Sequence, residues 1–559
     1  MPVDEDACAK KEMGKKFKAC SPQEQQKEVR NATTKILMWG YLPASSPQRT
    51  PLLHPTPAPP PLHDQSWKSV CSGGCGFAMA ISDSGIVHTW GSTGDLGQSY
   101  VTAGKHEERP EPFPLPSERP IIQAAAGWAH CVVVTDGGEV YTWGWRECVP
   151  ASKLSSDTSM KGQGTGSHKE TCEAQVEERD GSEEGLFSRP LSLTDLIDPS
   201  DSGGISSMEA SLKNKSTSSS KSKSSSPVDK LQGGLPSSPK AQNSKGSKVS
   251  GGGAFIDKAG EEGFKKRRLA MELSTSSDSS SMANDENVSA PPCLVTLHPG
   301  VQIVSVAAGG RHSLALSDKG QVWGWGYGGE GQLGLGTRIR TVSSPHPVPC
   351  FGTGSQYWQE THSNVSKGVH MVDGGFAPKA PGSFIKAVAC GGRHSAVLTD
   401  AGALLTFGWG LYGQCGQGST DDEVSPCYVS SLGGLPIRAV AAGLWHTVCV
   451  TESGDVYSFG GNQFGQLGTG VDQAELLPRL LDAPALENVQ AVSVSCGARH
   501  SAICTDAGRI FCWGWNKYGQ LGQGDALDRG IPVEVPLEGG FAKGIACGWW
   551  HTLALFQQS

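Results

Sequence analysis

The sequence predicts an all-β fold, a β-propeller of seven blades, and three observations lead to this prediction. Glycine accounts for 74 of the 559 residues and proline for 35, a composition that disfavours long helices. Seven aromatic–glycine dipeptides mark a repeat along the chain, and four of the six spacings between them lie close to 52 residues. A second marker, Gly-x-x-His, lies thirteen residues before the aromatic in five units. Repeats of about fifty residues with short strands are typical of propeller blades. The seven dipeptides are Trp39-Gly40, Trp90-Gly91, Trp143-Gly144, Trp325-Gly326, Phe407-Gly408, Phe459-Gly460 and Trp513-Gly514.

Each unit contains the pattern of a β-hairpin. In one unit, residues 313–317 alternate between small and large side chains and predict a strand. Asp318-Lys319-Gly320 then predicts a turn, and residues 321–325 predict the returning strand. Glycine suits the turn because it adopts the positive φ that tight hairpins require.

The two ends of the chain each carry half of a unit. The last His-bearing unit runs to Ser559 without an aromatic–glycine strand, whereas the strand at 35–40 has no His-bearing strand before it. We therefore expect the N-terminal strand to pair with the C-terminal blade and close the ring, which leaves only short exposed edges.

Composition divides the chain into propeller and non-propeller segments. Residues 211–250 hold eight lysines, one acidic residue and no aromatic residue, which predicts disorder. The expected segments are a disordered tail at 1–34, blades at 35–145, a disordered Ser/Lys-rich insert at 146–292, and blades at 293–559 with a loop insert at 351–382.

Two kinds of signal lie in the long insert. Lys265, Lys266, Arg267 and Arg268 form a basic run typical of a nuclear-localisation signal, although such runs can also be simple solvated charge. Ser226 and Ser238 precede prolines and are candidate phosphorylation sites, and chance explains such pairs equally well. We expect a nuclear protein, with the cytoplasm as a second location.

Charge is unevenly distributed. The chain has a net charge of −8 and residues 211–250 contribute +7, so the remainder sums to −15. An acidic ring can contact basic proteins, and direct nucleic-acid binding is expected only through the basic insert. The alternative is that the acidity only keeps a large β protein soluble. No run of about 18 apolar residues occurs, so no membrane partner is expected.

The recurring histidines and cysteines predict structural roles. One equivalent position in six blades cannot converge on a metal ion, so we expect each histidine to satisfy buried backbone groups between blades. Cys390, Cys496 and Cys547 occupy one repeat position and are expected to fill the core. The sequence offers no catalytic residues, no metal site and no cofactor site. The six histidines are His130, His312, His394, His446, His500 and His551.

The repeat resembles the regulator of chromosome condensation family over roughly 35–145, 295–350 and 383–559. Gly-Gly-Arg-His-Ser at 309–313, the Asp-x-Gly turn, Trp-Gly and Gly-Gln-Leu-Gly carry this resemblance. It implies a seven-bladed propeller, and the family's founding activity is nucleotide exchange on a nuclear small GTPase. The plant ultraviolet-B receptor is similar in its repeats, but it carries Gly-Trp-Arg-His, and no unit here has Trp followed by Arg directly before the repeat histidine.

The two residues before each repeat histidine vary from blade to blade, which makes them candidates for surface recognition. We expect a non-catalytic interaction scaffold, nuclear and associated with chromatin or histones. A guanine-nucleotide exchange factor for a Ran-like GTPase is the alternative, and a photoreceptor of the ultraviolet-B type is the second alternative. The expected partners are histones or a small GTPase, together with an import receptor for the basic run. The recognition candidates are Trp128, Arg311, Arg393, Trp445, Arg499, Trp549 and Trp550.

Overall fold

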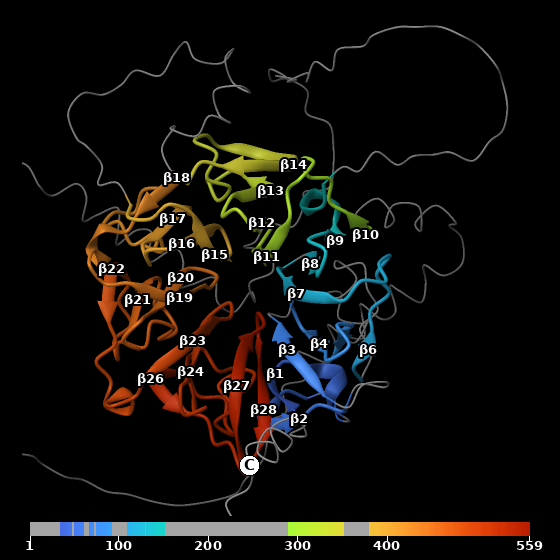
Figure 1. The fold of residues 1–559 in the computed structure, drawn as a ribbon. Coiled ribbons are helices and arrows are strands. Elements are labelled where there is room, and N and C mark those ends of the chain that lie inside the picture. Colours follow the sequence, from blue (N-terminus) through green and yellow to red (C-terminus); the bar gives the residue numbers. More distant parts are fainter. Residues whose placement is uncertain are drawn as a thin grey trace, which may run out of the picture. The chain divides into compact units, whose positions relative to one another are not determined.

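The computed structural model describes residues 34–46, 48, 50–60, 66–71, 74–91, 109–128, 130–150, 289–350 and 380–559. These residues all belong to one compact unit of the chain. They form seven four-stranded antiparallel sheets arranged around a common centre (Figure 1). The described residues contain strands and short 3-10 helices but no α-helix. The predicted all-β fold with seven blades is therefore confirmed.

The blades are numbered here in chain order, with the sheet that contains the C-terminus as blade 7. Blade 1 is β3 (Trp67–Cys71), β4 (Ala78–Ser82), β5 (Val87–Trp90) and β6 (Glu111–Pro112). Blade 2 is β7 (Ile121–Ala126), β8 (His130–Thr135), β9 (Val140–Trp145) and β10 (Ser289–Leu294). Blade 3 is β11 (Ile303–Ala308), β12 (His312–Ser317), β13 (Val322–Gly328) and β14 (Ile339–Val348). Blade 4 is β15 (Ile385–Cys390), β16 (His394–Thr399), β17 (Leu404–Gly408) and β18 (Glu423–Tyr428).

Blade 5 is β19 (Ile437–Ala442), β20 (His446–Thr451), β21 (Val456–Gly460) and β22 (Glu475–Leu480). Blade 6 is β23 (Ala491–Cys496), β24 (His500–Thr505), β25 (Ile510–Gly514) and β26 (Arg529–Glu534). Blade 7 is β27 (Gly540–Cys547), β28 (His551–Gln558), β1 (Thr34–Gly40) and β2 (Leu52–Pro57). The 3-10 helices are η1 (Pro43–Ser45), η4 (Arg146–Cys148), η6 (Ser430–Leu432) and η7 (Pro484–Leu486).

Blade 7 combines strands from both ends of the described chain. Strand β1 lies between β28 and β2 in this sheet. It pairs antiparallel with β28 from Thr34 opposite Gln557 to Gly40 opposite His551.

Two strands extend beyond the segment boundaries expected from composition. Strand β1 begins at Thr34, inside the expected tail, and β10 begins at Ser289, inside the expected insert. Strand β10 is the outer strand of its sheet and pairs only with β9, with a register shift between Ala290 and Cys293. An outer strand tolerates the Pro-Pro pair at 291–292 that resembles a linker in sequence. The rest of the tail (1–33), of the insert (151–288) and of the loop (351–379) lies outside the described residues, as do Ser226, Ser238 and the basic run at 265–268.

The core consists of seven apolar clusters, and each lies between two neighbouring blades. The aromatic residue of each of the seven repeat-marking dipeptides is fully buried. The glycine that follows has φ between +96° and +115° in all seven blades. At Gly326 a Cβ atom would lie 2.6 Å from the carbonyl oxygen of Arg311. Backbone conformation and this close approach together explain why glycine follows the aromatic.

Candidate functional site

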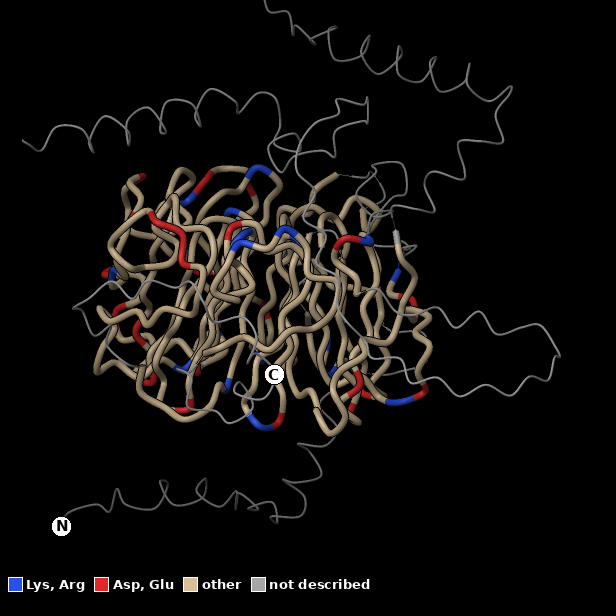
Figure 2. The backbone as a smooth tube through the Cα atoms, turned by 90° about the horizontal axis from the view of Figure 1, so that it is seen from above, with Lys and Arg blue, Asp and Glu red and all other residues tan. Residues whose placement is uncertain are grey.

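The loops that precede the repeat histidines lie on one face of the ring. In an antiparallel blade, the connection from the first to the second strand lies at the same end as the connection from the third to the fourth. Backbone hydrogen bonds join the two connections: Tyr327 N–H donates to Arg311 O and Trp409 N–H to Arg393 O, both at 2.9 Å. In Figure 2, Lys, Arg, Asp and Glu residues lie mainly in the loops at the two ends of the blades.

Aromatic and arginine side chains from blades 2 to 7 gather on this face and contact one another. We call this set the aromatic–arginine belt. Most of its side chains are half-buried, so that each has a packed side and an accessible side. The belt comprises Tyr41, Trp128, Trp145, Arg311, Tyr327, Arg393, Trp409, Tyr412, Trp445, Phe464, Arg499, Trp515, Tyr518, Trp549 and Trp550.

Each belt arginine lies against aromatic rings. The guanidinium carbon of Arg311 lies 4.4 Å from the ring centroid of Trp145, and its Nη1 lies 3.8 Å from Glu147. Arg393 lies 5.0 Å from the Trp409 ring. Contacts of this kind attract the cation to the face of the ring.

All three arginines link neighbouring blades, since Arg311 belongs to blade 3 and its partners Trp145 and Glu147 to blade 2. Arg393 of blade 4 donates to Glu330 of blade 3 at 3.2 Å. Arg499 of blade 6 lies 4.5 Å from the ring of Phe464, which belongs to blade 5. Only 8% of Arg499 is exposed. The arginines are thus fixed in position by packing and by carboxylates.

Aromatic pairs extend the belt between the arginines. Tyr412 and Trp445 have ring centroids 5.4 Å apart. Trp128 of blade 2 and Trp549 of blade 7 lie 5.1 Å apart, although blade 1 separates their blades in the ring. The described part of blade 1 contributes no side chain to the belt.

All seven recognition candidates from the sequence lie in the belt, but about half of the belt escaped sequence reasoning. A second aromatic residue directly follows the repeat-marking aromatic–glycine dipeptide in five blades. In three blades, a further aromatic residue directly precedes the Gly-Gln-x-Gly loop. Either recurrence was a signal that could have been found. The additional residues are Tyr41, Trp145, Tyr327, Trp409 and Trp515, and Tyr412, Phe464 and Tyr518.

The repeat histidines form a ladder between blades. His394 Nε2 lies 2.8 Å from Thr447 Oγ1 in the next blade, and that hydroxyl donates to the backbone carbonyl of Gln414. A hydroxyl has one proton to donate, so Nε2 of His394 carries the proton of the bond to Thr447. The histidine thus links two blades through a side-chain hydroxyl, which itself bonds a backbone carbonyl. The five links are His130–Ser313, His312–Ser395, His394–Thr447, His446–Ser501 and His500–Thr552.

Burial keeps the ladder histidines neutral. Loss of hydration lowers the pKa of His394 to about 3 and that of His130 to about 4. His551 is also fully buried, and neither of its ring nitrogens has a hydrogen-bond partner among the described residues. The ladder therefore ends at blade 7.

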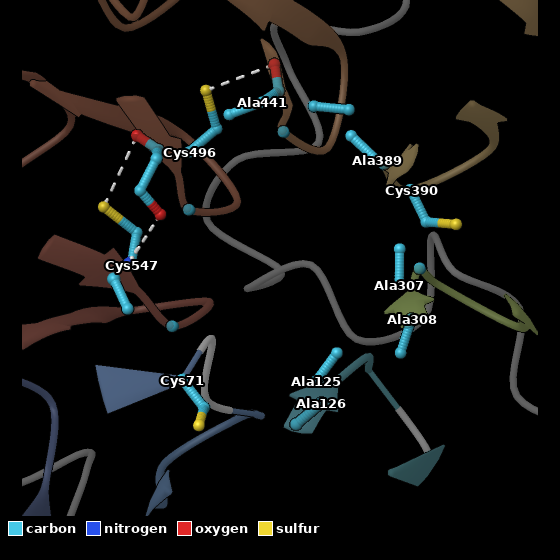
Figure 3. Close-up of a pocket in the computed structure, with 18 of the residues that line it drawn as sticks. Cys71, Ala125, Ala126, Ala307, Ala308, Ala389, Cys390, Ala441, Cys496 and Cys547 are labelled. Carbon is cyan, nitrogen blue, oxygen red and sulfur yellow. Dashed lines mark hydrogen bonds between the residues drawn. The ribbon is translucent and has the colours of Figure 1, made fainter. Parts of the chain in front are cut away.

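The first strands of the seven blades line a central cavity of about 390 Å³. Figure 3 shows its wall, which contains Cys71, Cys390, Cys496 and Cys547 together with alanines. The thiol of Cys496 donates to Ala441 O of the preceding blade at 3.7 Å. Cys547 is a buried member of one inter-blade cluster, and Cys390 and Cys496 pack against two others, as expected of core-filling residues. All three also line the cavity. No group of three His, Cys, Asp or Glu side chains suited to a metal was found in the described part of the chain.

The cavity thiols are expected to resist alkylation in the folded protein. Burial raises the pKa of Cys390 and of Cys547 to about 12, and the thiolate is the reactive form. At pH 7.5 we expect iodoacetamide to modify both about a thousandfold more slowly than in guanidinium. Cys427, half-buried on an outer strand, serves as the internal control. Peptide mass spectrometry gives the rates, and equal rates at Cys390 and Cys427 would contradict this expectation.

Seven four-stranded blades, a shared repeat and a belt of binding-type side chains define a repeat β-propeller with one candidate recognition face. The sequence matches the RCC1-like domain family over residues 269–554, and the regulator of chromosome condensation (RCC1) repeat over 84–134 and 121–148. The chain belongs to the RCC1-like family.

Relatives in sequence cover only parts of this chain. It is 34% identical over 277 residues to the Ultraviolet-B receptor UVR8 of Arabidopsis thaliana, a match that spans 49% of this chain and 56% of the receptor. It is 34% identical over 218 residues to human RCC1 domain-containing protein 1, covering 32% of this chain and 57% of that protein. The chain thus spans little more than half the length of these relatives.

Solved structures share the fold at lower identity. Human WBSCR16 has a TM-score of 0.56 at 18% identity, with 94% of this chain and 99% of that chain covered. Yeast RCC1 (Prp20), solved bound to Kap60, has a TM-score of 0.55 at 17% identity, with 100% and 97% covered. A second Prp20p structure, described together with its binding to Gsp1p and histones, also scores 0.55 at 17% identity, with 97% and 95% covered. Among the described residues, none forms a helix of the length and apolarity needed to cross a membrane.

Proposed function

We propose that this protein is a non-catalytic scaffold that binds a basic chromatin protein, a histone, through the aromatic–arginine belt. The belt itself is the observation that carries this proposal. Tryptophan, tyrosine and arginine supply most of the binding energy in protein interfaces. Arg393 and Arg499 are held between their neighbours before any partner arrives, so their ordering costs little on binding.

Charge supports a basic partner. The chain outside residues 211–250 sums to −15, and histones are strongly basic. The yeast relative Prp20p is described with binding to histones, which supports the same class of partner. A nuclear location, with import through Lys265–Arg268, belongs to this proposal.

Nucleotide exchange on a small GTPase is the alternative function. Exchange needs no catalytic side chain, only a surface that binds the nucleotide-free GTPase more tightly than the loaded form. A rigid face such as the belt meets that requirement. Photoreception of the ultraviolet-B type is the second alternative, and it requires a change of oligomer mass on irradiation.

Binding of a purified core-histone dimer tests the proposal. We expect Arg393→Ala combined with Trp409→Ala to weaken binding about tenfold, because both side chains lie on the accessible belt. The matched control is Phe384→Ala. Phe384 is 47% exposed and lies against the Gly320 turn, at the other end of the blades.

The outcomes separate the candidates. Equal affinity of the belt variant and the wild type would overturn the belt as the histone site. If the protein ignores histones but accelerates release of labelled GDP from a nuclear small GTPase, exchange replaces the scaffold proposal.

A further inference from the structure

The boundaries between neighbouring blades, here called seams, are not equivalent. Five of them, from blade 2/3 to blade 6/7, share two sets of hydrogen bonds at the belt face. The first set is the histidine ladder. The second is a chain of backbone bonds close to the cavity: Trp128 N–Gly309 O, Gly310 N–Gly391 O, Gly392 N–Gly443 O, Leu444 N–Ala498 O and Ala498 N–Trp549 O, at 3.0 to 3.1 Å.

Among the residues that the structure describes, neither set includes a bond to blade 1. At the 1/2 seam, Phe77 replaces the histidine and Cys131 replaces the hydroxyl. Both side chains are buried in one apolar cluster with Trp143. Replacing both partners of a buried hydrogen bond by apolar groups changes stability little. The 1/2 seam is therefore matched, in the sense that it leaves no polar group without a partner at this position.

The 7/1 seam is mismatched. His551 keeps the ladder position, but Ala78 stands where the next blade should offer a hydroxyl. Ala78 pairs with Trp90 as Ser395 pairs with Phe407, which places the two residues at equivalent positions. Nε2 of His551 and the hydroxyl of Ser45 are buried there without a partner among the described residues, whereas an unpartnered Nδ1 is common to all six repeat histidines. Removing one partner of a buried pair leaves the full desolvation penalty on the other.

The same seam is fastened at its other end. At the end opposite the belt, Thr34 N–H donates to Ser66 Oγ at 3.1 Å, and Trp67 N–H donates to Thr34 Oγ1 at 3.0 Å. Toward the belt, the bond from Ala44 N–H to Gly91 O (3.0 Å) joins the outer parts of the two blades. Near His551, the indole N–H of Trp90 in blade 1 donates to the sulfur of Met38 in blade 7 at 3.3 Å. His551 itself has no hydrogen bond to blade 1 within the described residues, and the rest of this part is held by apolar packing.

We propose that the 7/1 seam is built to open at its belt end, with the Thr34 contacts as the hinge. Opening exposes His551 to water and separates the Trp549 ring from the Trp128 ring. Because Trp549 belongs to the belt and also lines the cavity, opening changes both surfaces at once. The five seams from 2/3 to 6/7 stay closed, because opening any of them breaks a histidine ladder link and a backbone hydrogen bond together.

Hydrogen exchange on the full chain tests this proposal. We expect strands β4 and β28 to exchange about tenfold faster than the equivalent strands β16 and β20 of the 4/5 seam. Ala78→Ser places a hydroxyl opposite His551 and should slow exchange in β4 and β28 about fivefold. The matched control is Ala80→Ser, two residues along the same strand and in the same cluster, where no histidine faces the new hydroxyl.

A double-mutant cycle shows whether the mismatch is the cause. His551→Phe recreates the apolar pairing of the 1/2 seam and should also slow exchange. Combined with Ala78→Ser it leaves the new hydroxyl opposite a phenyl ring, so the gain should disappear. Equal protection of all four strands in the wild type, or equal effects of Ala78→Ser and Ala80→Ser, would overturn the proposal.

Discussion

Lowering the pH from 7 to 5 is expected to unfold the ring, because its six buried histidines cannot bind protons while it stays folded. Burial lowers the pKa of His312 and of His500 to about 3, whereas an unfolded histidine has a pKa near 6.5. Below pH 6.5 the unfolded chain therefore binds more protons than the folded one. This contribution to stability is intact above pH 6.5 and is lost progressively as the pH falls toward 3.

The size of the effect decides the outcome. Each such histidine lowers the free energy of unfolding by about 1.4 kcal/mol per pH unit, so six of them remove about 8 kcal/mol per unit. Whole domains are stable by only about 5 to 15 kcal/mol. Tryptophan fluorescence should show a transition between pH 6 and 5. His346→Asn, at an exposed ring outside the ladder, should leave the midpoint unchanged. A transition only below pH 4 would assign acid unfolding to carboxylates instead.

Replacing Leu37 by proline is expected to destabilise the ring by about 3 kcal/mol or more. Strand β1 lies between β28 and β2, so Leu37 has paired residues on both sides, Ala554 and Pro57. Proline there removes a backbone hydrogen bond between paired strands in the middle of a sheet. The midpoint of urea unfolding measures the loss.

A second variant on the same strand separates side-chain from backbone effects. Lys35→Ala removes an exposed side chain that donates to Gln558, and should change stability by no more than about 0.5 kcal/mol. If Leu37→Pro is as stable as Lys35→Ala, pairing of the N-terminal strand is not what closes the ring.

The inner strands could be predicted because their residues repeat. The alternating run at 313–317, the Asp-x-Gly turn and the aromatic–glycine strand correspond to β12, its turn and β13. The outer strands could not be placed in the same way. They carry prolines and exposed side chains, as in β10 and β22. The long insert also separates the outer strand β10 from β9, the strand with which it pairs.

The belt was only half predictable for a different reason. Positions that vary between repeats identified Arg393 and Arg499, but contacts such as Arg393–Glu330 join residues far apart in sequence. The ladder partner was open to prediction, since Ser or Thr directly follows the repeat histidine in five blades. The central cavity has no local signature, because it exists only once seven first strands meet.

The ladder also constrains how such a ring can grow by duplication. A blade with histidine followed by Ser or Thr carries both halves of a link, one for the blade ahead and one for the blade behind. Blades 3 to 7 all have this dipeptide, so a copy of any of them placed among the others would find partners on both sides. Blade 1, with Phe77-Ala78, and blade 2, with His130-Cys131, lack that property. Their order is fixed, and the tandem array can lengthen or shorten only elsewhere.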